Sequence, residues 1–153
     1  MTLKVETPRA LAGHVGRELG ASDWLEIDQA RIDSFAATTG DDHWIHVDVG
    51  RARRELPGGR TIAHGLLTLS LIPRLQRSIW TIEKRGRGLS YGYNRVRFTA
   101  AVPVGARIRL QQTLKAAEPA AGAVRFTFES TVEVEGADRP ALVAETIVLI
   151  YES

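Results

Sequence analysis

The chain has 153 residues, which fits one compact domain that buries a core without metals or disulfides. Hydrophobic residues make up 44% and charged residues 25%, and these ordinary values exclude a disordered or fibrous class. Cysteine is absent, which excludes disulfides, cysteine-ligated zinc and thiol catalysis. We therefore expect a single domain over residues 1–153.

Charge and hydropathy give no sign of a nucleic-acid or membrane partner. The formal net charge is only +2, because 20 basic residues are balanced by 18 acids. The most apolar run, 65–72, is far shorter than the roughly 20 residues that span a bilayer. The N-terminus has no apolar stretch behind a basic start and does not resemble a signal peptide. These patterns predict a cytoplasmic protein.

Helical signals begin near the N-terminus. Thr7 followed by Pro8 is typical of a helix start, and the apolar spacing that follows predicts a short helix ending near Gly20. The segment 24–27 is a short strand candidate.

Two further helices are predicted from their caps. Asp28 can cap a helix that runs through residue 38, and Gly40 fits the C-terminal cap of that helix. Asp48 can cap a short helix over residues 49–54.

The segment from Gly65 to about Ile79 is predicted to be a long helix. Its leucine and isoleucine residues cover most of the circumference, which is typical of a helix buried on all sides. Pro73 lies inside this helix, removes one backbone donor and is expected to kink it.

From Leu89 onward, alternation with a period of two residues replaces helical spacing. The predicted strands cover residues 89–98, 107–116, 124–134 and 142–151, and a loop is predicted at 118–122. An antiparallel sheet that follows one apolar helix is expected to curl around it, which gives the α+β class.

An acid- and imidazole-rich segment lies between the predicted helices, and it reads Thr39-Gly40-Asp41-Asp42-His43-Trp44-Ile45-His46-Val47-Asp48. A carboxylate and an imidazole that converge on one water molecule make an acid/base site, and Asp41 and His46 can converge if the backbone turns between them. The spacing of the acids and histidines matches no zinc pattern, so we expect no metal. On these residues alone, Asp41 and His46 could instead merely finish a helix.

Three blocks together resemble the MaoC-like (R)-specific enoyl-CoA hydratases, and the NodN-like dehydratases are the most similar subgroup. They are the segment above, Thr61-Ile62-Ala63-His64-Gly65-Leu66-Leu67-Thr68-Leu69-Ser70-Leu71 and Tyr91-Gly92-Tyr93-Asn94-Arg95-Val96-Arg97-Phe98. The resemblance implies a hotdog fold, a homodimer and reversible hydration of trans-2-enoyl-CoA thioesters to (R)-3-hydroxyacyl-CoA. Coenzyme A is then part of the substrate, and no separate cofactor is implied.

The family motif is Gly-Asp-x-Asn-Pro-x-His, and here His43 and Trp44 replace its Asn and Pro while the spacing from Asp41 to His46 is kept. The resemblance implies that Asp41 is the principal base and that His46 orients the water and shares proton transfer. The division of proton transfer between the two stays open, because a coupled pair titrates as a unit. The replacements affect the loop and the pocket shape more than the acid/base pair.

Other candidate residues have two readings each. Gly65 is the oxyanion candidate, because amides at a helix start are unpaired and the dipole is positive there, but close helix packing explains it equally well. Ser70 matches a position that is polar in family members, but a serine hydroxyl that bonds to a carbonyl of its own helix explains it equally well. Asn94 and Tyr91 could face the substrate or the dimer partner, or they could be ordinary strand residues with local hydrogen bonds. For His64, an ordinary, partly buried histidine that bonds a loop carbonyl is favoured over a group that takes part in the chemistry.

Basic side chains can receive the phosphates of coenzyme A, because guanidinium groups match phosphate geometry. The candidates are Arg51, Arg53, Arg54, Lys84, Arg85 and Arg87, with a solvated face as the alternative for each. Two other functions share the expected fold, since fold alone does not establish activity. They are a catalytically silent acyl-thioester-binding protein and a thioesterase.

Overall fold

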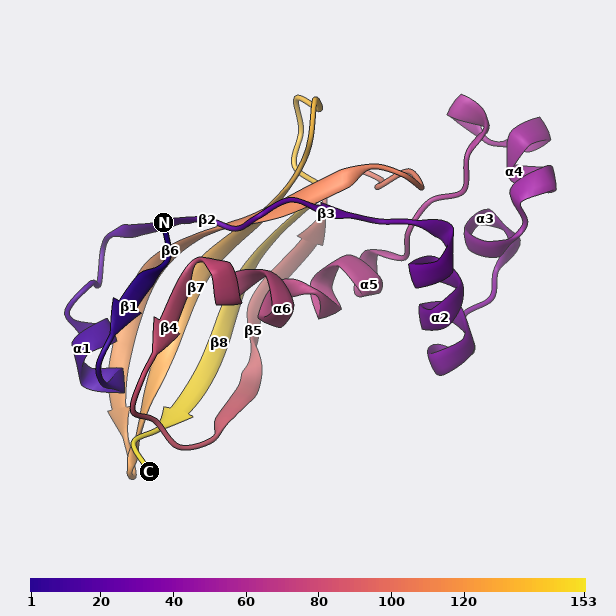
Figure 1. The fold of residues 1–153 in the computed structure, drawn as a ribbon. Helices are drawn as coiled ribbons and strands as arrows, with labels where there is room; N and C mark the ends of the chain where they lie inside the picture. Colours follow the sequence, from indigo (N-terminus) through magenta and orange to yellow (C-terminus); the bar gives the residue numbers. More distant parts are fainter.

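An antiparallel sheet forms the larger layer in the computed structural model, which describes residues 1–153 (Figure 1). Its strand order is β2-β6-β7-β8-β5, and β3 also pairs with β6. The strands are β2 (Glu18–Ala21), β3 (Leu25–Glu26), β5 (Gly88–Phe98), β6 (Arg107–Ala120), β7 (Ala123–Val134) and β8 (Leu142–Tyr151). The α+β class and the four long predicted strands are confirmed. The loop predicted at 118–122 is too long, because β6 extends to Ala120 and the hairpin turns at Gly122 with φ 69°.

The apolar helical segment lies along the concave face of this sheet (Figure 1). It consists of α5 (Gly65–Ser70), α6 (Ile72–Leu75) and the 3-10 turn η2 (Gln76–Ser78), so the expected interruption near Pro73 is present. The prediction of burial on all sides is wrong for this chain. Leu66 is 56% exposed and Pro73 is exposed, because the sheet covers only one side of the helix.

A second helical group, α2 (Gln29–Thr39), α3 (Trp44–Val47), α4 (Val49–Glu55) and the 3-10 turn η1 (Pro57–Gly59), extends beyond one end of the sheet (Figure 1). The caps predicted from sequence are confirmed. The Asp28 carboxylate accepts from the Arg31 amide at 2.9 Å, and Gly40 adopts φ 79° after α2. The Asp48 carboxylate accepts from the Arg51 amide at 2.9 Å at the start of α4.

The N-terminal region differs from the prediction. Helix α1 (Pro8–Ala12) ends at Gly13, not near Gly20, and residues 18–21 form strand β2. Gly16, with φ 86°, turns the chain, and pairing with β6 then overrides the local helical spacing. The parallel pair of β1 (Leu3–Val5) and β4 (Trp80–Ile82) was not predicted, because three residues are too few to show a period.

A buried polar chain crosses the concave face beneath α6. The Trp80 indole Nε1 donates to Gln112 Oε1 at 2.9 Å, and Gln112 Nε2 donates to Ser130 Oγ at 3.1 Å and to Gln76 Oε1 at 3.3 Å. The Ser130 and Thr146 hydroxyls are 3.0 Å apart. These bonds satisfy polar groups that are otherwise costly inside an apolar core. No helix of the structure is long and apolar enough to cross a membrane.

Candidate active site

Asp41, His46 and His64 converge where the helical projection meets the start of α5. A carboxylate oxygen of Asp41 and one ring nitrogen from each histidine lie within 4.8 Å of one another. Gly40 ends α2 in the left-handed conformation, and α3 then forms a single turn that carries His46 inward. His46 and His64 are buried and Asp41 is exposed, so the group opens to solvent on the Asp41 side.

His46 is fixed in one tautomer. Its Nδ1 lies 2.7 Å from the Ile62 carbonyl oxygen, which can only accept, so Nδ1 carries the proton and Nε2 keeps a lone pair in the neutral ring. Burial lowers the pKa of His46, although the Ile62 bond and the Asp41 charge oppose this, and His64 lowers the pKa further. The ring is therefore held neutral with Nε2 able to accept a proton.

Gln29, on the first turn of α2, clamps the segment that carries His46. Its Nε2 donates to the His46 carbonyl oxygen at 2.7 Å and to Asp33 Oδ1 at 2.9 Å. Its Oε1 accepts from the buried Thr61 hydroxyl at 2.6 Å. Gln29 was not among the residues predicted to form the site. No local pattern marks it, because two of its partners are distant in the chain.

His64 has the loop-carbonyl bond expected of it and also lies in the site. Its Nε2 donates to the Asp41 carbonyl oxygen at 2.8 Å, and its ring stacks on His46 with centroids 3.8 Å apart. The Phe35 ring also lies close to the His64 ring, with the two centroids 4.8 Å apart. Its Nδ1 is buried and has no protein partner. The place of His64 beside His46 could not be read from local sequence, since it depends on the position of Asp41 in the fold.

Gly65 begins α5 beside a cavity of about 270 Å³ that is also lined by His46, Thr68 and Phe98. A Cβ atom at residue 65 would lie 2.7 Å from the Phe98 ring, so the close packing requires glycine. The first amides of a helix have no partner within it. Close packing and an open amide beside His46 therefore coexist at Gly65.

Three other predicted site residues lie elsewhere. Ser70 is exposed and its hydroxyl donates to the Leu66 carbonyl oxygen at 2.7 Å, within the helix. The Asn94 amide donates to Glu145 Oε1 at 2.7 Å, and this bond lowers the pKa of Glu145. Tyr91 is 59% exposed. None of the three lines the cavity at His46, and the irregular register of β5 at 90–92 and 93–95 changes the direction of its side chains.

The replaced motif positions also lie outside the cluster. His43 is exposed, and its ring centroid lies 5.8 Å from that of Trp44. The Arg51 guanidinium lies 4.1 Å from the Trp44 ring centroid. These contacts shape the loop surface, while Asp41 and His46 form the group with His64.

Asp41, His46 and His64 are also the side chains that could hold a metal ion. Their geometry suits this poorly, because the two stacked imidazoles are inclined by only 23°. Lone pairs lie in the ring planes, so nearly parallel rings do not direct both nitrogens at one tetrahedral ion.

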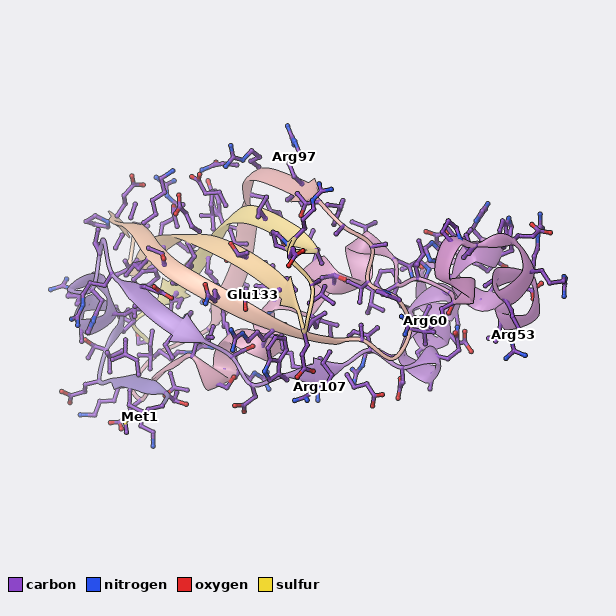
Figure 2. All side chains as sticks on the ribbon, turned by 90° about the horizontal axis from the view of Figure 1, so that it is seen from above. Met1, Arg53, Arg60, Arg97, Arg107 and Glu133 are labelled. Carbon is purple, nitrogen blue, oxygen red and sulfur yellow. The ribbon has the colours of Figure 1, made fainter.

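The basic residues considered for phosphates are dispersed. Arg51 pairs with Glu55 at 2.9 Å and Lys84 with Glu6 at 2.6 Å, while Arg87 lies 3.7 Å from the Tyr151 ring centroid. Figure 2 shows Arg53 on the outer part of the helical projection. Arg85 makes no ion pair and lines a separate, larger cavity.

An antiparallel sheet curved around one helix defines a hotdog fold, and the carboxylate of Asp41 and the neutral imidazole of His46 lie close together beside His64, which precedes that helix. Residues 10–135 match the model of the MaoC-like domain, and the chain belongs to this family of dehydratases. The family resemblance and the hotdog fold predicted from sequence are confirmed.

Relatives agree with this assignment. The chain is 47% identical to 3-hydroxyacyl-thioester dehydratase Z of Mycobacterium tuberculosis (strain H37Rv) over 94% of its own length and 95% of the relative. It is 44% identical to nodulation protein N of Rhizobium leguminosarum over 89% of this chain and 86% of that protein. R-hydratase PhaJ1 from Pseudomonas aeruginosa, at 21% identity, superposes with a TM-score of 0.73 over 96% of this chain and 86% of that one. The last comparison shows the fold.

Proposed function

We propose that the protein catalyses the reversible (R)-specific hydration of trans-2-enoyl-CoA thioesters to (R)-3-hydroxyacyl-CoA, with water activated by Asp41 and His46. The observation that carries this proposal is the convergence of the Asp41 carboxylate with a neutral His46 whose Nδ1 is committed to Ile62. The relative named for 3-hydroxyacyl thioesters, at 47% identity over nearly the whole chain, supports the substrate class.

The two side chains supply base and acid in turn. One of them takes a proton from water as the water oxygen bonds to C3 of the enoyl group, and the electrons of the double bond move toward the thioester oxygen. The pair then returns a proton to C2, which completes the addition of water. Asp41 is assigned as principal base, and His46 orients the water and shares proton transfer through Nε2.

The negative charge that develops on the thioester oxygen requires a donor. The amide at Gly65 suits this role, because it opens α5, shares a cavity with His46 and lies at the positive end of the helix. The Phe98 ring occupies the space that a Cβ atom at residue 65 would need.

A homodimer is part of the proposal. Strand β5 is the last strand of the sheet, so its outer edge has backbone groups without a partner strand. The same strand exposes four large apolar side chains, Leu89, Tyr91, Tyr93 and Phe98. Exposed apolar groups on an open edge are typical of an interface. Light scattering should give about twice the chain mass of 16.8 kDa, and a mass of one chain would contradict the dimer.

The activity is tested with crotonyl-CoA, by loss of the conjugated enoyl absorbance and by the chirality of the product. Asp41→Asn and His46→Gln should each lower kcat by about 10²–10⁴ while the fold is kept, whereas the neighbouring changes Asp42→Asn and His43→Gln should have little effect. Unchanged rates in both dyad variants would refute the dyad, and an (S) product would refute the stereochemical assignment. Release of free thiol would identify a thioesterase, and binding without turnover a silent acyl-thioester binder.

A further inference from the structure

A second cavity, larger than the one at His46, lies away from the Asp41 and His46 pair. It has a volume of about 420 Å³ and lies on the concave side of the sheet. Residues of α6, η2 and β4 line one side of it, and residues of β5 and β8 line the other. Thr146, the end of the buried polar chain, is among them.

The two cavities lie one after the other between the helical segment and the sheet, and we call the strip that contains them the trough. Gly65, Thr68, Ile72 and Gln76 follow one another at spacings of three and four residues, so they share one side of the helical segment. The first two line the cavity at His46, and the last two line the larger cavity. Strand β5 also contributes to both, with Phe98 at one end and residues 88–90 at the other. At about 1.5 Å per residue, Gly65 and Gln76 are separated by roughly 16 Å along the helix.

The far end of this trough carries positive charge without compensation. Arg77 and Arg85 line the larger cavity, and neither makes an ion pair, while no acidic residue lines it. A guanidinium nitrogen of Arg85 lies 3.3 Å from the position that a Cβ of Gly88 would occupy, so this guanidinium lies directly over the start of β5. Two unpaired guanidinium groups at the mouth of a cleft attract anions and can hold a carboxylate or phosphate by paired hydrogen bonds.

We propose that Arg77 and Arg85, with the Gln76 amide, form an anion site that binds a charged group of the substrate roughly 16 Å from the reacting carbonyl. The inference rests on the proposed thioester at Gly65. Two parts of such a substrate can present that charge, namely a carboxylate at the far end of the acyl group or a phosphate of the carrier arm. Either occupant would run from one cavity to the other past Thr68, which lines the first, and Ile72, which lines the second.

The test compares the double variant Arg77→Met/Arg85→Met with Arg74→Met. Arg74 is a matched control, because it is exposed on α6 and does not line the cavity. Four thioesters are assayed: crotonyl-CoA, crotonyl N-acetylcysteamine, trans-2-dodecenoyl-CoA and its analogue with a terminal carboxylate. A fall in kcat/KM of about tenfold or more is expected for the substrate whose anion binds there.

The pattern identifies the source of the anion. A loss restricted to the terminal carboxylate substrate assigns the site to the acyl group. A loss with both crotonyl-CoA and dodecenoyl-CoA, but not with the phosphate-free N-acetylcysteamine thioester, assigns it to the carrier. No loss beyond that of Arg74→Met overturns the site.

A binding measurement tests the anion site independently of the proposed function. If the parent protein hydrates none of the four thioesters, the proposed function fails, and calorimetric titration with decanedioate and with free coenzyme A then decides the anion site. Binding of either anion that is weakened about tenfold in the double variant, and kept in Arg74→Met, supports the site. Equal binding to all three proteins, or none to the parent, refutes it.

Discussion

The imidazole rings of His46 and His64 stack at 3.8 Å, and each ring donates one N–H to a backbone carbonyl of a different segment. His46 is bonded to Ile62 and His64 to Asp41, so the pair ties the loop after α2 to the segment before α5. The free nitrogen of His64, Nδ1, is buried without a partner. Such an acceptor is costly unless water or substrate donates to it.

Two substitutions at His64 separate its two nitrogens. Asn can place an oxygen near the position of Nδ1, whereas Gln can place an N–H near Nε2 and keep the bond to Asp41. If anchoring of Asp41 is the main contribution, His64→Gln should retain more activity than His64→Asn, with a difference of about tenfold for one lost hydrogen bond. The measurement is kcat and KM on crotonyl-CoA. The reverse order would show that the acceptor at Nδ1 matters more, and equal loss would indicate that the stacked ring itself is required.

The lowered pKa of His46 predicts an acid limb for activity and for stability. Because His46 orients the water and shares proton transfer through an unprotonated Nε2, kcat/KM should fall only at a pH below the ordinary histidine value of 6.5. The unfolded chain binds the proton at 6.5 but the folded protein only at lower pH, so the unfolding free energy should decrease as pH falls below that value. Thermal unfolding across this range tests the sign. His46→Gln should weaken the dependence, and a slope of the opposite sign would contradict the neutral ring.

Gln29→Leu should destabilise the protein by about 1–3 kcal/mol, because it leaves the Thr61 hydroxyl and the His46 carbonyl without their partner. Activity should fall as well, since α3 is no longer held against α2. Gln29→Glu keeps an acceptor for Thr61 and serves as the comparison. Urea unfolding and kcat report the two effects, and a fully stable, fully active Gln29→Leu would show that the clamp is dispensable.

Gly65→Ala should lower both stability and activity, because its Cβ would lie 2.7 Å from the Phe98 ring and collide with it. The free energy of unfolding should decrease by about 1–3 kcal/mol. The double variant Gly65→Ala/Phe98→Ala removes the collision but keeps the amide. Recovery of kcat relative to Gly65→Ala alone would support the role of the amide, with Phe98→Ala as the control. Recovery of stability without kcat would count against approach of the carbonyl at this position.

Much of the site region follows from local signals. Asp28, Gly40 and Asp48 are helix caps whose side chains or backbone act within a few residues, so the sequence predicted the helices on both sides of Asp41 and His46. The five-residue spacing of that pair is likewise a local feature. The long strands follow from alternation, because one face of each meets the core.

Contacts between distant segments were decided only by the tertiary structure. Gln29, His64 and Phe98 act on residues far away in the chain, and no period or cap within the sequence indicates those partners. The same reason accounts for β2, where pairing with β6 overrode a helical pattern, and for Ser70, Asn94 and Tyr91, whose side chains lie away from the His46 cavity. The sequence by itself determined which groups can carry the chemistry. The fold decided which of them meet, because that depends on how the sheet and its central helix pack.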